Sequence, residues 1–380
     1  MNRRRRSNHH VTIRDVARAA RASVSTVSAF LNDTDYVSAE MRERIEKAIR
    51  RLRYRPNLLA QGLRLHHTHT LAIVVPDLLN SFYTEVVRGA KDYAGMAKYT
   101  VLVGDSREHW EEEKTYLDEF QRRRVDGVIR IPAVDDAGGQ AHLVMGDVPV
   151  IYADRFPHSS DRNVGCVGVD NVLAATDATR YLLSLRHRRI AIITGPLESK
   201  NSADRLKGYR RAMRSARVPV PRNLVHIGDN GIISGHRAAM DLLSGTHRPT
   251  AVFCTNNMMA LGVLQAMQKL KLRCPKDISL LGFDDFYWAT LLRPRLTMVR
   301  QPAREIGMTA ARMLIEHIEG RQKKPSVQCL ATRLMVRDSC APPSDVSGPS
   351  PRKSRAKGPL QKPRTPRSTG PKQDSPAGPS

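Results

Sequence analysis

The stretch Thr12–Asn32, TIRDVARAARASVSTVSAFLN, predicts two short helices that are joined by a tight turn. Thr12 and Asp15 stand three residues apart, which is the spacing of a capping box at the start of a helix. Ser23 is a suitable N-cap for the second helix. Apolar residues at helical spacing form the expected inward face of that second helix: Val24, Val27, Phe30 and Leu31.

The outward face of the second helix is expected to carry small, mostly hydroxylated residues: Ser25, Thr26, Ser28 and Ala29. Such a face suits close approach to base edges and phosphates in a major groove about 12 Å wide. This arrangement is typical of a helix-turn-helix, whose second helix contacts bases. Periodicity alone fits two helices of an ordinary helical core equally well, so the identity of the residues must decide.

The same residues resemble the opening of the LacI/GalR (lactose-repressor) family of bacterial regulators. The resemblance continues in YVSAEMRERIEKAIRRLRYRPN and in VVPDLLNSFYTEVVRGA, and it runs in order from Thr12 to Asp338. It implies an all-α helix-turn-helix head and a two-lobed α/β core of the periplasmic-binding-protein type. It also implies a sequence-specific transcriptional regulator of the repressor type, whose affinity for operator DNA is controlled by a small polar ligand bound between the lobes.

Charge favours an anionic partner but does not identify one. The 380 residues include 62 Lys and Arg against 37 Asp and Glu, a net charge of +25. DNA attracts such a surface through its phosphates and through counterion release, but ribosomal contacts, heparin-like polymers and acidic membranes fit the charge equally well. No apolar stretch approaches the roughly 18 residues of a membrane helix, and no secretory signal follows the first arginines, so we expect a cytoplasmic protein.

The five cysteines are scattered and lack any CxxC spacing, which argues against a disulfide framework or a zinc site and fits a reducing cytoplasm. The histidine-rich run at 66–70, HHTHT, has no acidic or cysteine neighbour and is not expected to bind metal. Walker, G-x-S-x-G, HExxH and GxGxxG motifs are absent from the sequence. We therefore expect no metal, no cofactor and no enzymatic activity.

The sequence predicts five segments in order: 1–10, a basic arm; 11–55, the helix-turn-helix head; 56–69, a hinge helix and linker; 70–340, the two-lobed core; and 341–380, a basic tail rich in proline and serine. The tail has too few large apolar residues to offset the entropy of ordering and is expected to be disordered. The arm and the tail are either solvated, inert segments or sources of additional phosphate contacts.

A third helix is predicted to begin after Ser38 and to complete the core of the head with its apolar face: Met41, Ile45, Ala48, Ile49 and Leu52. Arg55–Pro56 is expected to end it, because the residue before proline avoids helical geometry. The following Pro56–Leu63, PNLLAQGL, is too short to be a stable helix alone.

In the family, the segment matching Pro56–Leu63 is a hinge helix that folds on operator DNA. One leucine from each of two subunits then wedges into the minor groove and kinks the duplex, and the matching residue here is Leu63. Gln61 and Gly62 depart from the usual Arg-Ser before that leucine. An ordinary interdomain linker remains the alternative.

The resemblance assigns DNA contacts to these residues: Thr12, Ser23, Val24, Ser25, Thr26, Ser28, Ala29, Asn32, Tyr54, Asn57, Ala60 and Leu63. Val24 and Ser25 are expected to contact bases. Ala29 stands where many relatives have a polar or basic residue that reaches the bases, often arginine. Arg21 stands in the turn where the family usually has glycine, and a left-handed arginine there costs roughly 1–2 kcal/mol.

From Leu71 onward, apolar strand candidates alternate with amphipathic helices: 71–76, 100–105, 127–132, 149–154, 167–170, 189–195, 224–229, 251–255, 279–285 and 296–301. This alternation predicts two doubly wound parallel sheets with a ligand crevice between them. The resemblance adds three crossovers between the lobes. It also places the helix Arg304–Glu319 in the N-terminal lobe and returns a strand around Cys329–Val336 to the other lobe.

Polar residues at the predicted strand ends suggest what the crevice binds: Asp77, Asn80, Asp154, Arg155, Asp170, Arg205, Asn256 and Asp284. They suit a polar molecule such as a sugar, a sugar acid or a nucleobase, although any one of them could instead be a helix cap or part of a loop ion pair. The resemblance assigns effector contacts to Asn80, Phe82, Tyr83, Asp154, Arg205, Asn230, Asn256 and Asp284.

Two positions depart from the family near this crevice. Asn230 stands where the family often has an aromatic residue that stacks on a flat ligand, which argues against a ring-stacked pose. Asn257 replaces a common aspartate. The expected assembly is a homodimer or a dimer of dimers on a pseudo-palindromic operator. A solute-binding protein of a transport system and a sugar- or nucleotide-processing enzyme remain the alternatives.

Overall fold

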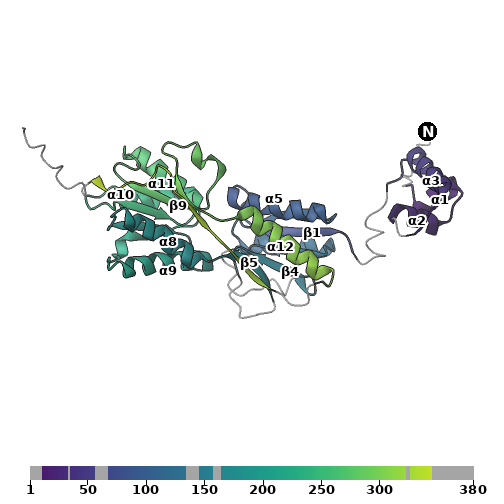
Figure 1. Cartoon of the computed structure of the whole chain (residues 1–380), viewed down its shortest axis with the longest axis horizontal. Coiled ribbons are helices and arrows are strands. Elements are labelled where there is room, and N and C mark those ends of the chain that lie inside the picture. Colours follow the sequence, from purple (N-terminus) through teal and green to yellow (C-terminus); the bar gives the residue numbers. More distant parts are fainter. Residues whose placement is uncertain are drawn as a thin grey trace, which may run out of the picture. The chain divides into compact units, whose positions relative to one another are not determined.

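The computed structural model describes residues 11–32, 35–55, 67–133, 145–156, 164–321 and 326–344. Figure 1 shows a helical head and two α/β lobes. The basic arm, most of the tail and hinge residues 56–66 lie outside the described residues, and so do three candidate DNA contacts: Asn57, Ala60 and Leu63. Among the described helices, none has both the length and the apolar character needed to cross a membrane.

The head consists of α1 (Ile13–Ala20), α2 (Val24–Asn32) and α3 (Ala39–Leu52). At the start of α1, the backbone N–H and the hydroxyl of Thr12 donate to the Asp15 carboxylate at 3.0 and 2.7 Å. The hydroxyl oxygens of Ser23 and Ser38 accept from backbone N–H groups in the first turns of α2 and α3. Val16, Val27 and Ile45 form the fully buried centre, so the predicted three-helix core is confirmed.

Two details of the second helix differ from the prediction. Val24 is 39% exposed instead of facing inward. Ala29 is half-buried and packs against the core of the head instead of facing outward. Both differences have one cause, because α2 contacts the core through Val27 and the residues from Ala29 to Leu31, while Val24 and Ser25 are exposed.

Two helices of the head end in left-handed arginines. Arg21 follows α1 with φ 49°, and the Arg44 guanidinium donates to the carbonyl oxygens of Ala20 and Arg21 at 2.6 and 3.1 Å. Arg53 follows α3 with the same φ of 49°. The expected stop at Arg55–Pro56 is therefore wrong by two residues, since α3 already ends in a left-handed C-cap.

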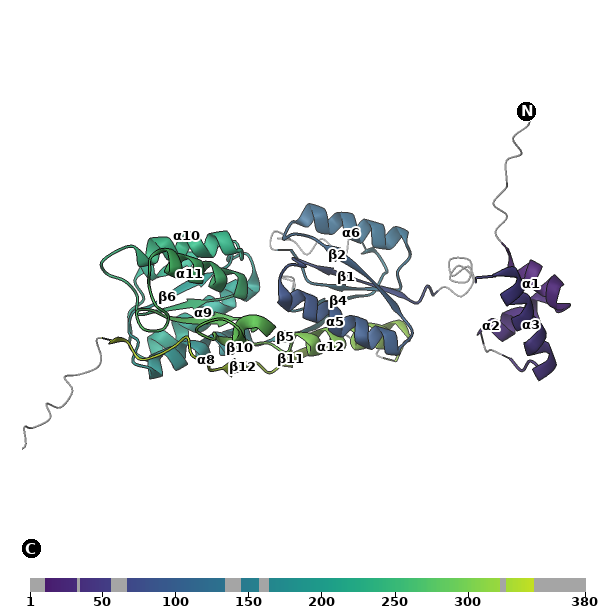
Figure 2. The same ribbon diagram turned by 90° about the horizontal axis from the view of Figure 1, so that it is seen from above.

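The first lobe holds a sheet in the order β11-β5-β4-β3-β1-β2, with every pair parallel. Its strands are β1 (Thr70–Val75), β2 (Thr100–Asp105), β3 (Gly127–Arg130), β4 (Val150–Ala153), β5 (Gly165–Val169) and β11 (Val327–Leu330). One face packs on α5 (Ser81–Met96) and α12 (Ala303–Ile318), and the other packs on α6 (Trp110–Arg122), as Figure 2 shows. The placement of Arg304–Glu319 in this lobe is confirmed.

The second lobe holds a sheet in the order β12-β10-β9-β8-β6-β7. Its strands are β6 (Ile190–Thr194), β7 (Val225–Ile227), β8 (Ala251–Cys254), β9 (Ser279–Phe283), β10 (Thr297–Arg300) and β12 (Arg333–Met335). Helices α8 (Asn171–Ser184) and α9 (Lys200–Ser215) cover one face, and α10 (Ile232–Leu243) and α11 (Asn257–Lys269) cover the other. Two short 3₁₀ helices lie at Arg222–Leu224 and Tyr287–Thr290.

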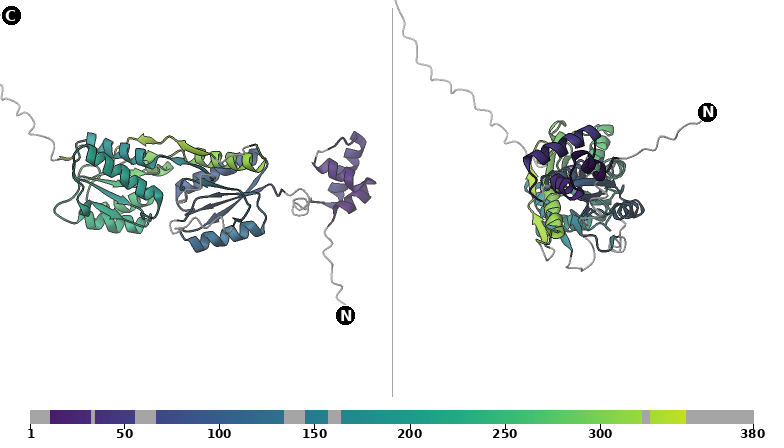
Figure 3. Two further views of the ribbon diagram at one scale, coloured as in Figure 1. Left: turned by 90° about the horizontal axis from the view of Figure 1, so that it is seen from below. Right: turned by 90° about the vertical axis from the view of Figure 1, so that its right-hand side faces the viewer.

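The chain passes between the lobes after β5, after β10 and after β11, which confirms the three predicted crossovers. The prediction of one strand around Cys329–Val336 is wrong, because this segment belongs to both sheets (Figure 3). Its first part, β11, pairs with β5 in the first lobe, and β12 pairs antiparallel with β10 in the second lobe. A continuous segment thus forms an edge of each sheet.

Candidate functional site

A cavity of about 100 Å³ lies between the two lobes, where strands end and helices begin. Asp154 follows β4, Asp284 follows β9, and Asn256 lies between β8 and α11. The cavity brings together every predicted effector contact: Asn80, Phe82, Tyr83, Asp154, Arg205, Asn230, Asn256 and Asp284. Asp77 and Arg155 also line it, whereas Asp170 does not, because its carboxylate caps α8 and accepts from Leu173 N–H at 2.8 Å.

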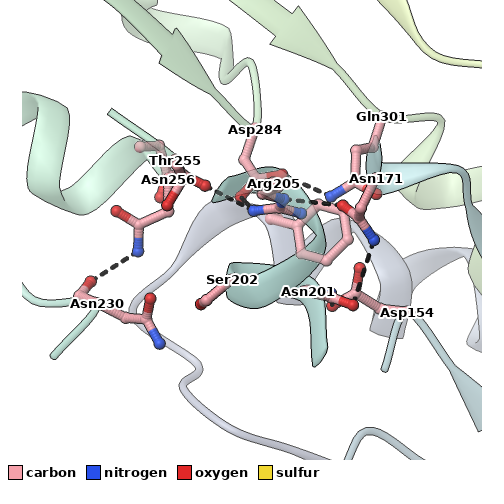
Figure 4. A network of polar contacts seen from close by, with 12 residues as sticks. Asp154, Asn171, Asn201, Ser202, Arg205, Asn230, Thr255, Asn256, Asp284 and Gln301 are labelled. Atoms are coloured by element: carbon pink, nitrogen blue, oxygen red, sulfur yellow. Dashed lines mark hydrogen bonds and ion pairs between the residues drawn. The ribbon is translucent and has the colours of Figure 1, made fainter. Parts of the chain in front are cut away.

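Arg205 lies at the centre of a polar network (Figure 4). Its Nε donates to Asn171 Oδ1 at 2.8 Å, and its Nη1 donates to the Thr255 carbonyl oxygen at 2.6 Å. The same Nη1 lies 3.6 Å from Asp284 Oδ2, and the guanidinium carbon lies 3.7 Å from the centroid of the Phe283 ring. Contacts on several sides fix the orientation of this buried cation.

Two buried carboxylates flank Arg205. Gln301 Nε2 donates to Asp284 Oδ1 at 2.6 Å, and Asn201 Nδ2 donates to Asp154 Oδ2 at 3.0 Å. Asp154 Oδ1 has no hydrogen-bond partner among the described residues. Burial raises the pKa of Asp154 to about 6, against the opposing charge of Arg205. Burial also raises the pKa of Asp284, again opposed by Arg205.

Four residues of the cavity have left-handed backbones: Glu108 with φ 63°, Asp154 with φ 58°, Asn230 with φ 69° and Asp284 with φ 66°. Aspartate and asparagine adopt this conformation more readily than other side-chain-bearing residues, because their short polar groups can bond locally. Such conformations cluster at sites where a side chain must be held in one direction. Here the backbone turn follows directly after β4 and β9 and brings both carboxylates to the cavity.

The wall contributed by the first lobe contains a second arginine that is already neutralised. Arg155 Nη1 and Nη2 donate to the two carboxylate oxygens of Glu108 at 2.6 and 2.7 Å. Nη2 also donates to the Tyr83 hydroxyl at 2.8 Å, and Nη1 donates to the Pro132 carbonyl oxygen at 2.9 Å. Burial raises the pKa of the Tyr83 phenol well above its ordinary value, so this hydroxyl stays protonated.

Asparagine side chains join the lobes across the cavity. Asn257 Nδ2 donates to Asn80 Oδ1 at 2.9 Å and to Ser81 Oγ at 3.4 Å, and Asn201 contacts Asp154 as described above. Asn80 and Asn256 are at the same time helix caps, since their Oδ1 atoms accept from Phe82 N–H and Met259 N–H. The cap role and the position in the cavity therefore coexist at these two residues.

Several residues of the site were not predicted. The cavity is also lined by Glu108, Ser199, Asn201, Ser202, Asp229 and Gly231. The strand-end rule could have found Asp229, which follows β7, whereas Glu108 lies in a loop without a motif. Asn171 and Gln301 extend the network to the first two crossovers. Asn171 lies after β5, at the start of α8, and Gln301 lies between β10 and α12.

The candidate DNA contacts of the head lie mostly at its surface. Thr12, Ser23, Val24 and Ser25 are exposed, while Thr26, Ser28, Ala29 and Tyr54 are half-buried, and the side chain of Asn32 is not described. The Ser23 hydroxyl lies 2.7 Å from those of Ser25 and Thr26. The described residues contain no group of three histidine, cysteine or acidic side chains that could hold a metal ion.

Comparison with known proteins identifies the class. Residues 12–57 match the model of bacterial regulatory proteins of the lacI family, and residues 179–340 match a periplasmic binding protein-like domain. Catabolite control protein A of Priestia megaterium is 35% identical over 331 residues, covering 87% of this chain and 99% of that protein. The HTH-type transcriptional repressor PurR of Escherichia coli is 33% identical over 332 residues, covering 87% and 97%.

Solved structures agree with this classification. A Lac repressor dimer bound to operator and the anti-inducer ONPF has a TM-score of 0.78 and 28% identity, over 87% of this chain and 99% of that chain. A complex of the transcriptional regulator CelR with cellobiose has a TM-score of 0.67 and 31% identity, with the same coverage. The chain belongs to the LacI family, and it is a DNA-binding transcriptional regulator, not a transport protein.

Proposed function

We propose that the protein is a repressor that binds a pseudo-palindromic operator as a homodimer or a dimer of dimers, and that a small polar molecule in the cavity controls this binding. The observation that carries the proposal is the continuity of the polar network. Arg205 is bonded both to residues of the cavity and to Asn171 at the first crossover, and Asp284 is bonded to Gln301 at the second. A molecule that binds beside Arg205 and Asp284 therefore contacts groups that are themselves bonded to the segments that join the lobes.

The mechanism is a shift between two arrangements of the lobes. A molecule that donates to Asp154 and also contacts Arg205 binds both lobes at once, so it favours the arrangement in which they are close. Its effect on DNA equals its difference in affinity for the two arrangements. The segment 56–69 connects the first lobe to the head, and we propose that it folds on DNA with Leu63 as a wedge in the minor groove.

The relatives support this proposal through the molecules that they bind in their solved structures. The Lac repressor structure contains a dimer, an operator and a small anti-inducer, and the CelR structure contains cellobiose. In the head, we propose that Val24 and Ser25 contact bases, while phosphates are contacted by Ser23, Thr26 and Ser28. The other DNA contacts are assigned to Thr12, Ala29, Asn32, Tyr54, Asn57 and Ala60.

We propose further that the cavity binds its molecule without converting it and that the protein acts in the cytoplasm, where bacterial DNA is located. Four polar residues of the cavity have structural roles: Arg205 and Arg155 are held by hydrogen bonds, and Asn80 and Asn256 cap helices. The relatives of known name are regulators, which supports the same conclusion.

A gel-shift titration with DNA from upstream of the gene tests the proposal. The full chain is expected to bind one fragment well above non-specific DNA at physiological salt. Arg205→Ala is expected to retain this binding and to lose the response to small molecules. Arg180→Ala, at an exposed arginine of α8 that pairs with Asp177 of its own helix, serves as the matched control. Binding that never exceeds the non-specific level would refute the regulator mechanism.

A further inference from the structure

The cavity contains more negative than positive charge. Among the described residues, its lining includes the carboxylates of Asp77, Glu108, Asp154, Asp229 and Asp284 and two guanidinium groups, Arg155 and Arg205. Helices α5, α9, α10 and α11 begin at the cavity, and each N-terminus contributes about +0.5 of an elementary charge. With these included, negative charge still exceeds positive charge by about one unit, so the lining offers an anion no net attraction.

The positive groups are also occupied. Both terminal nitrogens of Arg155 donate to Glu108, and Arg205 donates to Asn171 and Thr255 and lies beside Asp284. A carboxylate or phosphate on a ligand would have to separate one of these arginines from its protein partner. Separating a buried ion pair leaves an uncompensated charge, which is strongly unfavourable.

A hydrogen-bond acceptor, by contrast, is available. Asp154 Oδ1 is buried at the cavity without a hydrogen-bond partner among the described residues. An ionised carboxylate can only accept hydrogen bonds, so it pairs with hydroxyl groups of a ligand. A buried acceptor that lacks a partner is costly, and a ligand donor removes that cost.

We propose that the cavity selects an uncharged, polyhydroxylated molecule, such as a free sugar or a sugar alcohol, and rejects derivatives that bear a carboxylate or a phosphate. The inference rests on the proposed ligand-controlled function and specifies the chemical class of the ligand. Neutral hydroxyls supply the donors that Asp154 lacks and leave both arginine pairs intact, whereas an anion does neither.

Thermal unfolding of the full chain with matched probes tests this inference. The neutral probes are glucose, galactose and ribose. Their charged counterparts are glucuronate and glucose 6-phosphate for glucose, galacturonate for galactose, and ribose 5-phosphate for ribose. At least one neutral probe is expected to raise the melting temperature by mass action. Its charged counterpart is expected to bind at least tenfold more weakly in isothermal titration.

Equal or tighter binding of the charged counterpart overturns the inference. A response to none of the neutral probes overturns it as well. A gel shift on the same preparation distinguishes a failure of the charge selectivity from a failure of the proposed function. If the operator is still bound specifically, the charge selectivity has failed and the regulator function stands, whereas loss of specific DNA binding refutes the proposed function itself.

A charge variant provides the mechanistic test. Asp154→Asn removes one negative charge from the cavity, so the preference for glucose over glucuronate, or for whichever neutral probe binds, is expected to fall at least tenfold. Asp241→Asn removes an exposed charge of α10 outside the cavity and is expected to leave the preference unchanged. Asp229→Asn, at an exposed carboxylate of the same cavity, gives a second test if Asp154→Asn folds poorly. A preference that survives both variants refutes the electrostatic basis.

Discussion

At the scale of single residues, Asp154 gives the cleft a dependence on pH. Burial raises its pKa to about 6, against a value near 4 in an unfolded chain. Because the folded state favours the protonated form, its stabilising contribution is complete below about pH 4 and is lost as the pH rises through 6. Relative to Asp154→Asn, the wild type should therefore lose up to about 3 kcal/mol of unfolding free energy between pH 4 and pH 7.

Urea unfolding of both proteins at several pH values measures this difference. Asp241→Asn, at an exposed position of α10, is expected to follow the wild type throughout. Parallel curves for the wild type and Asp154→Asn would show that Asp154 ionises normally. Burial raises the pKa of Asp154 and the charge of Arg205 lowers it. If the wild type loses stability relative to Asp154→Asn as the pH rises, burial has the larger effect, and if it gains stability, Arg205 has the larger effect.

Arg21 supplies a prediction for the head. The left-handed backbone of Arg21, with φ 49°, costs an arginine roughly 1–2 kcal/mol of folding free energy. Glycine avoids this cost, but it has greater conformational freedom in the unfolded state, and this freedom cancels part of the gain. Arg21→Gly is therefore expected to stabilise the head by about 0.5–1 kcal/mol. The carbonyl that accepts from Arg44 belongs to the backbone and is retained.

Native-state hydrogen exchange of α1 and α3 amides in the full chain measures the effect of Arg21→Gly. Exchange should be slower in the variant, and Arg21→Asn should show a smaller effect in the same direction, since asparagine tolerates left-handed geometry. Faster exchange in both variants would mean that the arginine side chain stabilises the turn more than its conformation destabilises it.

At the scale of elements, glycines determine how closely α5 and α12 pack. A Cβ at Gly307 would lie 1.9 Å from the Val86 carbonyl oxygen, and a Cβ at Gly89 would lie 1.9 Å from that of Arg304. Since backbone atoms cannot yield as a flexible side chain can, Gly307→Ala must move the helices apart. We expect it to destabilise the protein by about 1–3 kcal/mol, as overpacking usually does.

Chemical denaturation compares this variant with Gly95→Ala. Gly95 lies in the last turns of α5, and a Cβ there meets no atom within 4 Å. Gly95→Ala is expected to be neutral or to stabilise by up to about 1 kcal/mol, because alanine is the better helix former. Equal effects of the two substitutions would show that the α5–α12 contact is not as close as described.

The sequence predicted elements well where burial imposes a simple pattern. Each of the ten predicted strands before residue 302 is present. The inner strands of both sheets were predictable because strands covered on both faces are continuous apolar runs. The sequence failed where position depends on the rest of the fold. Val327–Leu330 is half-exposed at a sheet edge, so its sequence does not indicate which sheet it joins. Asp170 follows a strand like Asp154 does, but it caps a helix instead of lining the cavity.

At the scale of the whole molecule, the two lobes are held together by three chain crossovers and by amides across the cavity. The sequence could predict Asp154, Asn256 and Asp284 at the cavity, because strand ends of both sheets meet there. It could not predict the pairing of Asn257 with Asn80, since no local pattern relates residues so far apart. This pair joins the N-termini of α5 and α11, and it links the lobes independently of any ligand.

Asn257→Ala removes both donors that the second lobe offers to Asn80 and Ser81. A hydrogen bond of this kind contributes about 1 kcal/mol net, so the ratio of the close to the open arrangement should fall by about fivefold. Small-angle X-ray scattering should then give a larger radius of gyration without ligand, and a neutral sugar that binds both lobes should restore the smaller value. The apparent dissociation constant of this sugar should rise by up to the same factor, because the binding-competent arrangement is less populated.

Asn223→Ala, at an exposed position before β7, is the matched control. If Asn257→Ala leaves both quantities unchanged, the crossovers alone hold the lobes, and the asparagine pair only fills space between two helix ends.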